Sequence, residues 1–367
     1  MSAATSDVIE HRRTAALRIP SIGVLARTPP NFFSIPFGLA GLAVVWQLMA
    51  SLYGSPAAVG DALFIAAAAV WLALGAGAAA RLLRAPRVLL AELRDPVLSP
   101  FWALPWIVGM LLASGLEAYA HAGAKVIFIA FLLATIVYGG WLMGHWFVVD
   151  LDRSKLHPGY FLPTVAGGLL GGGLAGDIGL RALGWLSFGI GIVSWLMLGS
   201  LMINRLFFTA MLPAALIPTL AIEVAPPAVA GAAYFQLHGT TPDAVAFGLA
   251  GYAVLMVLVQ LRLVPLYARL SFAPGFWAFT FSWAAVAELA LRWLSIERPS
   301  GEVVYAALAA GAVSLLIAAI AARSLLAIGR GQFVPPPSRA PVTAPTPDAR
   351  APIAPRDGAA AGTRSVV

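Results

Sequence analysis

Three acidic side chains interrupt stretches of sequence that otherwise carry no charge, and they are the first candidates for chemistry. Glu117, Glu223 and Glu288 each lie within a long apolar stretch. An ionisable group inside such a stretch is costly to bury and marks a candidate functional site. Glu117 falls at the end of its stretch, where an interfacial carboxylate is expected. Glu223 and Glu288 lie deeper, so each is either a proton or ion site or a carboxylate hydrogen-bonded between helices.

The chain shows no sequence signature of catalysis. Cysteine is absent, which excludes disulfides, thiolate metal sites and cysteine nucleophiles. No HExxH motif occurs, and no Gly-Lys-Ser/Thr follows the glycines after Gly167 to make a phosphate loop. No local signature of a Ser/His/Asp triad or of a catalytic carboxylate pair is present. The sequence therefore predicts a protein that is not an enzyme and has neither a metal site nor a cofactor.

The composition predicts an all-α integral membrane protein. Of its 367 residues, 60% are hydrophobic and 11% are charged, whereas a soluble domain has about 25% charged residues. A membrane-spanning helix needs roughly 20 mainly apolar residues. Ten stretches of suitable length are expected at 31–53, 62–80, 98–118, 126–148, 158–176, 182–204, 210–234, 244–261, 273–291 and 303–322.

Alternate stretches share a proline after a bulky aliphatic residue. The four prolines are Pro36, Pro105, Pro163 and Pro218, spaced about sixty residues apart, which is enough for two spanning helices and their loops. The pattern predicts five helical hairpins with five kinked inner helices around a central pore, because the carbonyls freed by proline need a protein or water partner. A proline in the first turn of a helix would instead cost little.

The fifth repeat departs from this pattern. Phe281-Ser282 occupies the place where an aliphatic residue and proline are expected, and Phe279 lies two residues earlier. Glu288 follows Phe281 by two helical turns, so the two share nearly the same helix face. By itself, a phenylalanine at either position is an ordinary packing residue.

The basic residues indicate topology and do not indicate nucleic-acid binding. With ten spans, nineteen Lys and Arg residues fall on the side of both termini and four fall on the other side. The positive-inside rule then places both termini in the cytoplasm. We expect a cytoplasmic arm at 1–30, a membrane domain at 31–328, and a disordered Pro/Ala-rich tail at 329–367.

Three local sequences resemble the tellurite-resistance/dicarboxylate transporter family, which includes TehA-like proteins and the plant slow anion channels. They are Asn31-Phe32-Phe33-Ser34-Ile35-Pro36-Phe37-Gly38, Ile222-Glu223-Val224-Ala225-Pro226-Pro227-Ala228-Val229 and Gly275-Phe276-Trp277-Ala278-Phe279-Thr280-Phe281-Ser282. The resemblance covers roughly residues 28–328. It implies a homotrimer in the bacterial inner membrane with a pore in each protomer. It also implies a phenylalanine gate, for which Phe281 is the matching position and Phe279 the alternative, because many relatives have proline where this chain has Ser282.

These features together favour a channel for small anions that is gated by an aromatic ring. The expected lining offers hydroxyl groups and helix dipoles that bind an anion weakly. The hydroxyl residues are Ser34, Thr164, Thr219, Thr280 and Ser282. The alternative is a proton-coupled transporter of C4-dicarboxylate, sulfite or tellurium oxyanions that uses Glu288. A third possibility is a membrane scaffold that transports nothing.

Overall fold

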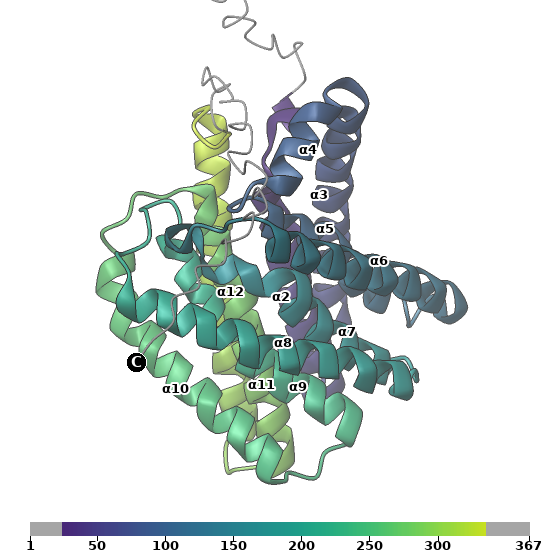
Figure 1. Ribbon diagram of the computed structural model, residues 1–367. Coiled ribbons are helices and arrows are strands. Elements are labelled where there is room, and N and C mark those ends of the chain that lie inside the picture. The colour runs from purple at the N-terminus through teal and green to yellow at the C-terminus, as the bar shows by residue number, and fades with distance from the viewer. Residues whose placement is uncertain (1–23, 335–367) are drawn as a thin grey trace, which may run out of the picture. The chain divides into compact units, whose positions relative to one another are not determined.

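The computed structural model describes residues 24–334, and every regular element in that part of the chain is helical (Figure 1). The α-helices are α2 (Ser34–Tyr53), α3 (Ala57–Arg84), α4 (Pro86–Arg94), α5 (Leu104–Gly115), α6 (His121–Val148), α7 (Gly167–Asp177), α8 (Arg181–Phe208), α9 (Ala225–His238), α10 (Ala244–Tyr267), α11 (Ala278–Glu297) and α12 (Glu302–Gly329). Most of the predicted arm and tail lies outside the described residues.

Seven helices are long and apolar enough to cross a membrane, or eight if the bent pair Pro86–Arg94 and Ser99–Gly115 forms one span. An all-helical chain with many candidate spans is therefore confirmed, and the number ten stays a prediction. The seventh predicted stretch, 210–234, needs a correction at its start. Residues 210–216 form no regular helix, and the helical segment runs over Ile217–His238. Pro213 lies in that irregular segment. Proline disrupts the interior of a helix, so its presence here fits the absence of one.

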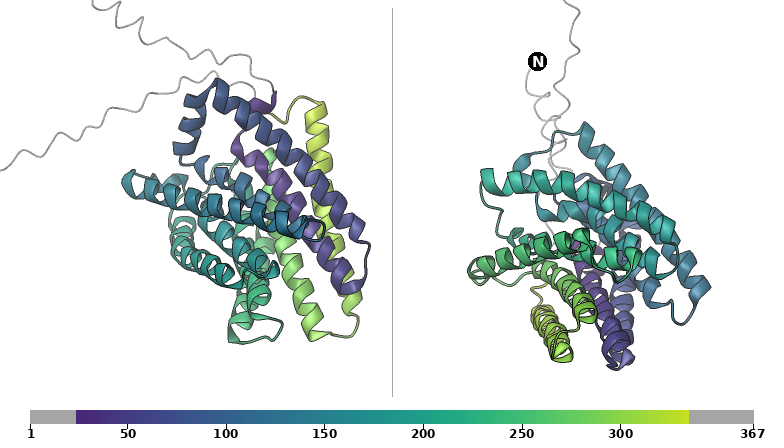
Figure 2. Two further views of the ribbon diagram at one scale, coloured as in Figure 1. Left: turned by 90° about the vertical axis from the view of Figure 1, so that its right-hand side faces the viewer. Right: turned by 90° about the horizontal axis from the view of Figure 1, so that it is seen from below.

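Five helices contact one another in a closed ring. In chain order α2 packs against α5, α5 against α7, α7 against α9, and α9 against α11, while α11 returns to α2. Figure 2 shows the first helix pair, α2 and α3, beside the last pair, α11 and α12, in both of its views. The ring therefore joins the two ends of the described chain.

Each ring helix also packs against one long helix that follows it in the chain: α3, α6, α8, α10 and α12 respectively. These long helices expose many large apolar side chains, such as Leu83, Val148 and Phe207. The ring helices are more buried than the long helices that follow them. In the long helix α3, 17% of the most apolar part is buried, whereas 83% is buried in the ring segment Ile217–His238. The exposed apolar surface fits contact with lipid.

A change of helix type precedes every ring helix. Four ring helices follow 3₁₀ turns, and α7 follows a 3₁₀ turn and a π-helix. The 3₁₀ elements are η2 (Pro30–Phe33), η3 (Ser99–Ala103), η5 (Pro158–Phe161), η7 (Ile217–Val224) and η8 (Pro274–Trp277), and the π-helix is η6 (Leu162–Ala166).

The four repeated prolines lie at or near these changes of helix type. Pro36 is the third residue of α2 and Pro105 the second of α5, while Pro163 lies in η6 and Pro218 is the second residue of η7. Proline costs little in a first turn, because the N–H groups there have no partner within the helix. The irregular geometry is therefore concentrated at one end of the ring helices.

Glycines let α7 and α8 approach closely. A Cβ at Gly168 would fall 2.5 Å from the backbone nitrogen of Gly191, and one at Gly191 would fall 2.6 Å from that of Leu169. Such contacts involve backbone atoms, so a side chain cannot move aside to relieve them. Small residues at these positions allow the backbone contact that drives helix association in membranes.

Gly191→Ala is expected to lower the free energy of unfolding of the purified protein by about 1–3 kcal/mol, the typical cost of overpacking, and so to lower its melting temperature. Gly189→Ala is the matched control on α8, because nothing lies within 4 Å of a Cβ built there. That control should be neutral or slightly stabilising, since alanine favours helix over glycine. Thermal melting in detergent micelles measures both variants, and equal melting temperatures would contradict the close-packing argument.

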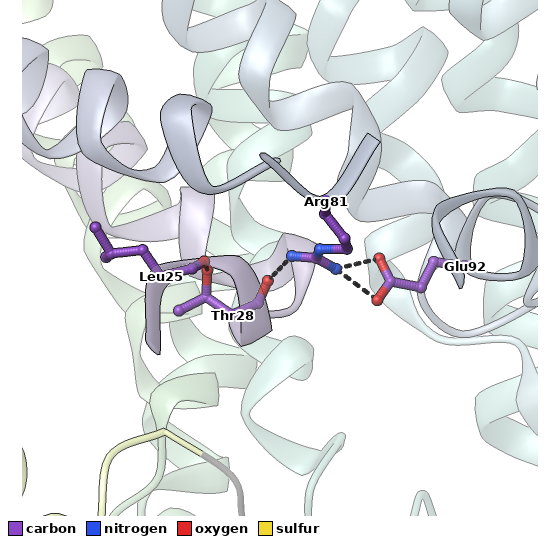
Figure 3. Close-up of polar contacts among 4 residues, drawn as sticks. All are labelled: Leu25, Thr28, Arg81 and Glu92. Carbon is purple, nitrogen blue, oxygen red and sulfur yellow. Dashed lines mark hydrogen bonds and ion pairs between the residues drawn. The ribbon is translucent and has the colours of Figure 1, made fainter. Parts of the chain in front are cut away.

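A buried arginine joins three segments at the end of α3 (Figure 3). One nitrogen of Arg81 donates to both carboxylate oxygens of Glu92 in α4 at 2.6 Å, and its other terminal nitrogen donates to the carbonyl of Thr28. The Arg81 guanidinium also lies 5.8 Å from the centre of the Trp102 ring. Arg81 therefore links the chain before α2, the short helix α4 and the turn before α5.

Candidate functional site

Two cavities lie within the ring of helices. The first, here called the apolar cavity, has a volume of about 250 Å³ and no charged lining residue. Residues from the beginnings of the five ring segments line it, including Ser34, Leu104, Leu162, Ala225 and Ala278. The positive ends of the helix dipoles are therefore directed toward this cavity.

The second cavity, here called the acidic vestibule, has a volume of about 560 Å³ and lies toward the other ends of the ring helices. Its charged lining residues are Asp61, Glu117, Asp177, Glu288 and Arg292. Four acids against one arginine give this vestibule a net negative formal charge. The two cavities therefore differ sharply in their electrostatic character.

Three side chains line both cavities: Leu169 from α7, Val229 from α9 and Phe281 from α11. Phe281 is the largest of them, and only 7% of its surface is exposed. Its ring stacks on the ring of Phe37 from α2, with centroids 3.7 Å apart and planes at 10°. Phe281 thus lies at the boundary between the apolar cavity and the acidic vestibule.

Glycine on the opposite helix makes room for this ring. A Cβ at Gly41 would fall 2.7 Å from the Phe281 ring, and one at Gly38 would overlap the Thr280 side chain. These small residues let α2 and α11 pack closely enough for Phe37 and Phe281 to stack.

Phe279 lies in a different environment. Its ring meets the ring of Tyr267 edge-on at 4.7 Å, and it lines a third cavity between α10, α11 and α12. Phe279 lines neither the apolar cavity nor the acidic vestibule. The two phenylalanines that the sequence analysis considered as gates therefore lie in different cavities. Of these two, Phe281 is the one that adjoins both the apolar cavity and the acidic vestibule.

Three of the five predicted hydroxyl residues line the apolar cavity: Ser34, Thr219 and Ser282. Each hydroxyl donates to a backbone carbonyl three or four residues earlier, at 2.6 to 2.9 Å. Thr280 also donates to a backbone carbonyl, while Thr164 Oγ1 is buried without a described partner, and neither residue lines the cavity. In this structure the hydroxyl protons of Ser34, Thr219 and Ser282 are directed to the backbone.

Glu288 forms an ion pair with Arg292 at 2.8 Å, one helical turn along α11. Both side chains are largely buried and both line the acidic vestibule, as Phe281 does. The sequence analysis counted Arg292 among the four basic residues on the side of the membrane opposite the termini, and it missed this contact. The Glu-Arg spacing of four residues was the available signal, because such pairs face each other on a helix.

The other acids of the vestibule also have partners. The amide of Gln236 donates to Asp177, and Asp61 accepts from Gln47 at 2.6 Å and from Tyr119 at 2.7 Å. Glu117 contacts His121 on the next turn of the chain.

Glu223 lies apart from both cavities. Its Oε1 atom is buried and has no hydrogen-bond partner among the described residues. The structure therefore does not bring Glu223 and Glu288 into one site. Within residues 24–334, no group of three His, Asp or Glu side chains could hold a metal ion.

A known protein family and two of its relatives match most of the chain. Residues 27–326 match the sequence model of a family described as voltage-dependent anion channel. A tellurite resistance protein TehA homolog from Haemophilus influenzae is 28% identical over 263 residues, which cover 71% of this chain and 80% of that protein. The S-type anion channel SLAH2 from Arabidopsis thaliana is 25% identical over 240 residues, which cover 62% of this chain and 44% of that protein.

Proposed function

Because the chain belongs to the voltage-dependent anion channel family, we propose that it conducts small anions through the two cavities and that Phe281 is the gate. One observation carries this proposal: the Phe281 ring lies between the apolar cavity and the acidic vestibule, where it stacks on Phe37. Homology supports transport of anions in general and argues against an enzyme. The substrate and the gate are our proposals.

We further propose ten membrane spans arranged as five hairpins, with the membrane domain at 31–328. The closed ring of helix contacts and the pairing of each ring helix with the next long helix support this arrangement. The uneven distribution of arginines supports cytoplasmic termini. In this topology the apolar cavity opens toward the cytoplasm and the acidic vestibule away from it. Assembly as a homotrimer in a bacterial inner membrane stays a prediction.

The apolar cavity suits weak anion binding. No charged side chain lines it, so the positive ends of the ring helices supply the favourable potential. The hydroxyl groups of Ser34, Thr219 and Ser282 would have to turn from their backbone partners to donate to an anion. A channel needs binding that is weak enough for the ion to leave. The site therefore fits conduction better than tight, selective capture.

Purified protein in liposomes tests the proposal directly. Chloride, nitrate, sulfite, a C4-dicarboxylate and tellurite would be supplied in turn, with voltage and pH on each side set independently. A channel gives flux that follows voltage without a proton gradient. Flux that requires a proton gradient would instead support the coupled transporter, and absence of flux for every anion would support a scaffold.

Glu288→Gln is expected to raise anion flux about two- to fivefold at low ionic strength. The change removes one negative charge from the acidic vestibule and releases Arg292 from its ion pair. Salt should reduce the gain, because mobile ions screen the vestibule charges. Glu297→Gln, an exposed change on the same helix outside the vestibule, is the control. A wild-type flux that depends on a proton gradient, with that dependence lost in Glu288→Gln, would instead point to transport coupled to protons through this carboxyl.

A further inference from the structure

A third cavity lies on the outer side of the ring and has no place in the conduction pathway. Here called the lateral groove, it has a volume of about 640 Å³ and is bounded by α10, α11 and α12. Its lining is apolar along most of its length, with Trp283, Val286, Val313 and Leu316 among the residues. Such a groove on the lipid-facing side of a membrane protein needs an apolar occupant.

The groove carries a charge at one end only. Arg323 is the one charged residue that lines it, and it lies at the same end as Phe276. The Arg323 guanidinium lies 4.9 Å from the centre of the Phe272 ring, which in turn contacts Phe276. Arg323 makes no ion pair with any residue between 24 and 334. A positive charge is thus held beside an aromatic cluster without a countercharge in the described chain.

The dimensions match one leaflet of a bilayer. Along α12 the lining runs from Ala309 to Arg323, which corresponds to about 21 Å of helix. Half of the hydrocarbon core of a bilayer is about 15 Å thick, and the polar headgroups lie beyond it. The aromatic rings near Arg323 fit the interface, where such side chains are enriched. An acyl chain in the groove would therefore place its headgroup near Arg323.

We propose that the lateral groove binds an anionic phospholipid, with one acyl chain along α11 and α12 and the phosphate at Arg323. A basic side chain at the headgroup level, joined to an apolar groove of leaflet depth, supplies both parts of this recognition. The proposal is independent of the anion pathway, because the groove shares no lining residue with the apolar cavity or the acidic vestibule.

Native mass spectrometry of the purified protein with added phosphatidylglycerol or phosphatidylcholine of the same chain length tests this site. The wild type should retain phosphatidylglycerol about fivefold more strongly. Arg323→Gln should lower retention of phosphatidylglycerol more than retention of phosphatidylcholine and so remove that preference. Arg330→Gln is the control, because Arg330 is an exposed arginine outside the groove. Equal effects of the two substitutions, or full displacement of the lipid by inorganic phosphate, would overturn the proposal.

A second variant tests the apolar part of the groove. Ala312→Trp should fill it and lower retention of both lipids, while Arg323 remains in place. Leu315→Trp, at an exposed position of α12 that does not line the groove, should leave retention unchanged. If Ala312→Trp instead dissociated an oligomer and left lipid retention intact, a second copy of the chain would be the occupant and the lipid proposal would be wrong.

Discussion

Phe281→Ala is expected to raise anion flux through the reconstituted protein by at least about tenfold, which corresponds to a barrier lower by about 1.4 kcal/mol. The Phe281 ring adjoins both cavities, so its removal would join the apolar cavity to the acidic vestibule. Leu169 and Val229 would still narrow the junction, but neither carries an aromatic ring. Flux of chloride and nitrate into voltage-clamped liposomes measures the effect.

The control for this experiment lies two residues away. Phe279→Ala removes an equally buried ring from the lateral groove and from its contact with Tyr267, and it should leave anion flux unchanged. Both substitutions remove a buried phenylalanine, which typically costs 3–5 kcal/mol of stability. Elution as a single species in detergent shows whether each variant has folded. A rise in flux with Phe279→Ala but not with Phe281→Ala would reject Phe281 as the gate.

Phe37 contributes a second aromatic ring to the same barrier. Its ring stacks on Phe281 and lines the apolar cavity, so it fixes the orientation of the Phe281 ring. Stacked aromatic rings contribute about 0.5–1.5 kcal/mol beyond the area that they bury. Opening the pathway by rotation of Phe281 must break this stack. The proposed gate therefore includes two stacked rings, one from α2 and one from α11.

The sequence predicted one member of this pair and not the other. Phe281 was proposed as the gate because it matches the family's gate position and breaks a local repeat of prolines. No sequence pattern singles out Phe37, because its role depends on the contact between α2 and α11, which lie near opposite ends of the described chain. Gly38 and Gly41 carry the available signal, since small residues on one helix face permit close approach. A single sequence does not reveal which helix approaches them.

The sequence analysis predicted hydroxyl residues at the pore, but it did not predict where their protons are donated. Ser34, Thr219 and Ser282 do line the apolar cavity, but their protons are donated to backbone carbonyls. Residue type alone does not show whether a hydroxyl satisfies its own helix or faces a ligand. Arg292 was missed because a charged residue near the end of an apolar stretch is typical of a loop. Its partner Glu288 keeps it in the vestibule.

The second large effect is expected at Arg81, which joins the chain before α2 to α4 and the turn before α5. Arg81→Met should destabilise this junction by about 3–5 kcal/mol, because it leaves the Glu92 carboxylate largely buried without its partner. The carbonyl of Thr28 loses its donor as well. Residues next to both tethered segments, including Pro29 and Leu98, line the apolar cavity. Loosening of the junction should therefore also disturb that cavity.

The pH dependence of this defect has a defined sign. Glu92 lies between the predicted spans, and burial raises its pKa while the Arg81 charge opposes that rise. Without Arg81 the pKa should rise further, so the carboxyl becomes neutral at a higher pH. A neutral carboxyl needs no countercharge. The stability difference between wild type and Arg81→Met should therefore be largest at high pH and shrink as pH falls through the raised pKa of the variant.

Hydrogen exchange resolved by peptide measures this defect where it arises. In Arg81→Met the backbone amides of α4 that follow Pro86 should exchange faster than in the wild type, while those of α8 should keep their protection. Arg84→Met, an exposed change one turn further along α3, should leave exchange unaltered. The double variant Arg81→Met with Glu92→Met should recover much of the loss, because replacing both charges with apolar side chains leaves neither one unpaired. If the double variant were as unstable as Arg81→Met alone, the unpaired carboxylate would not be the cause of the defect.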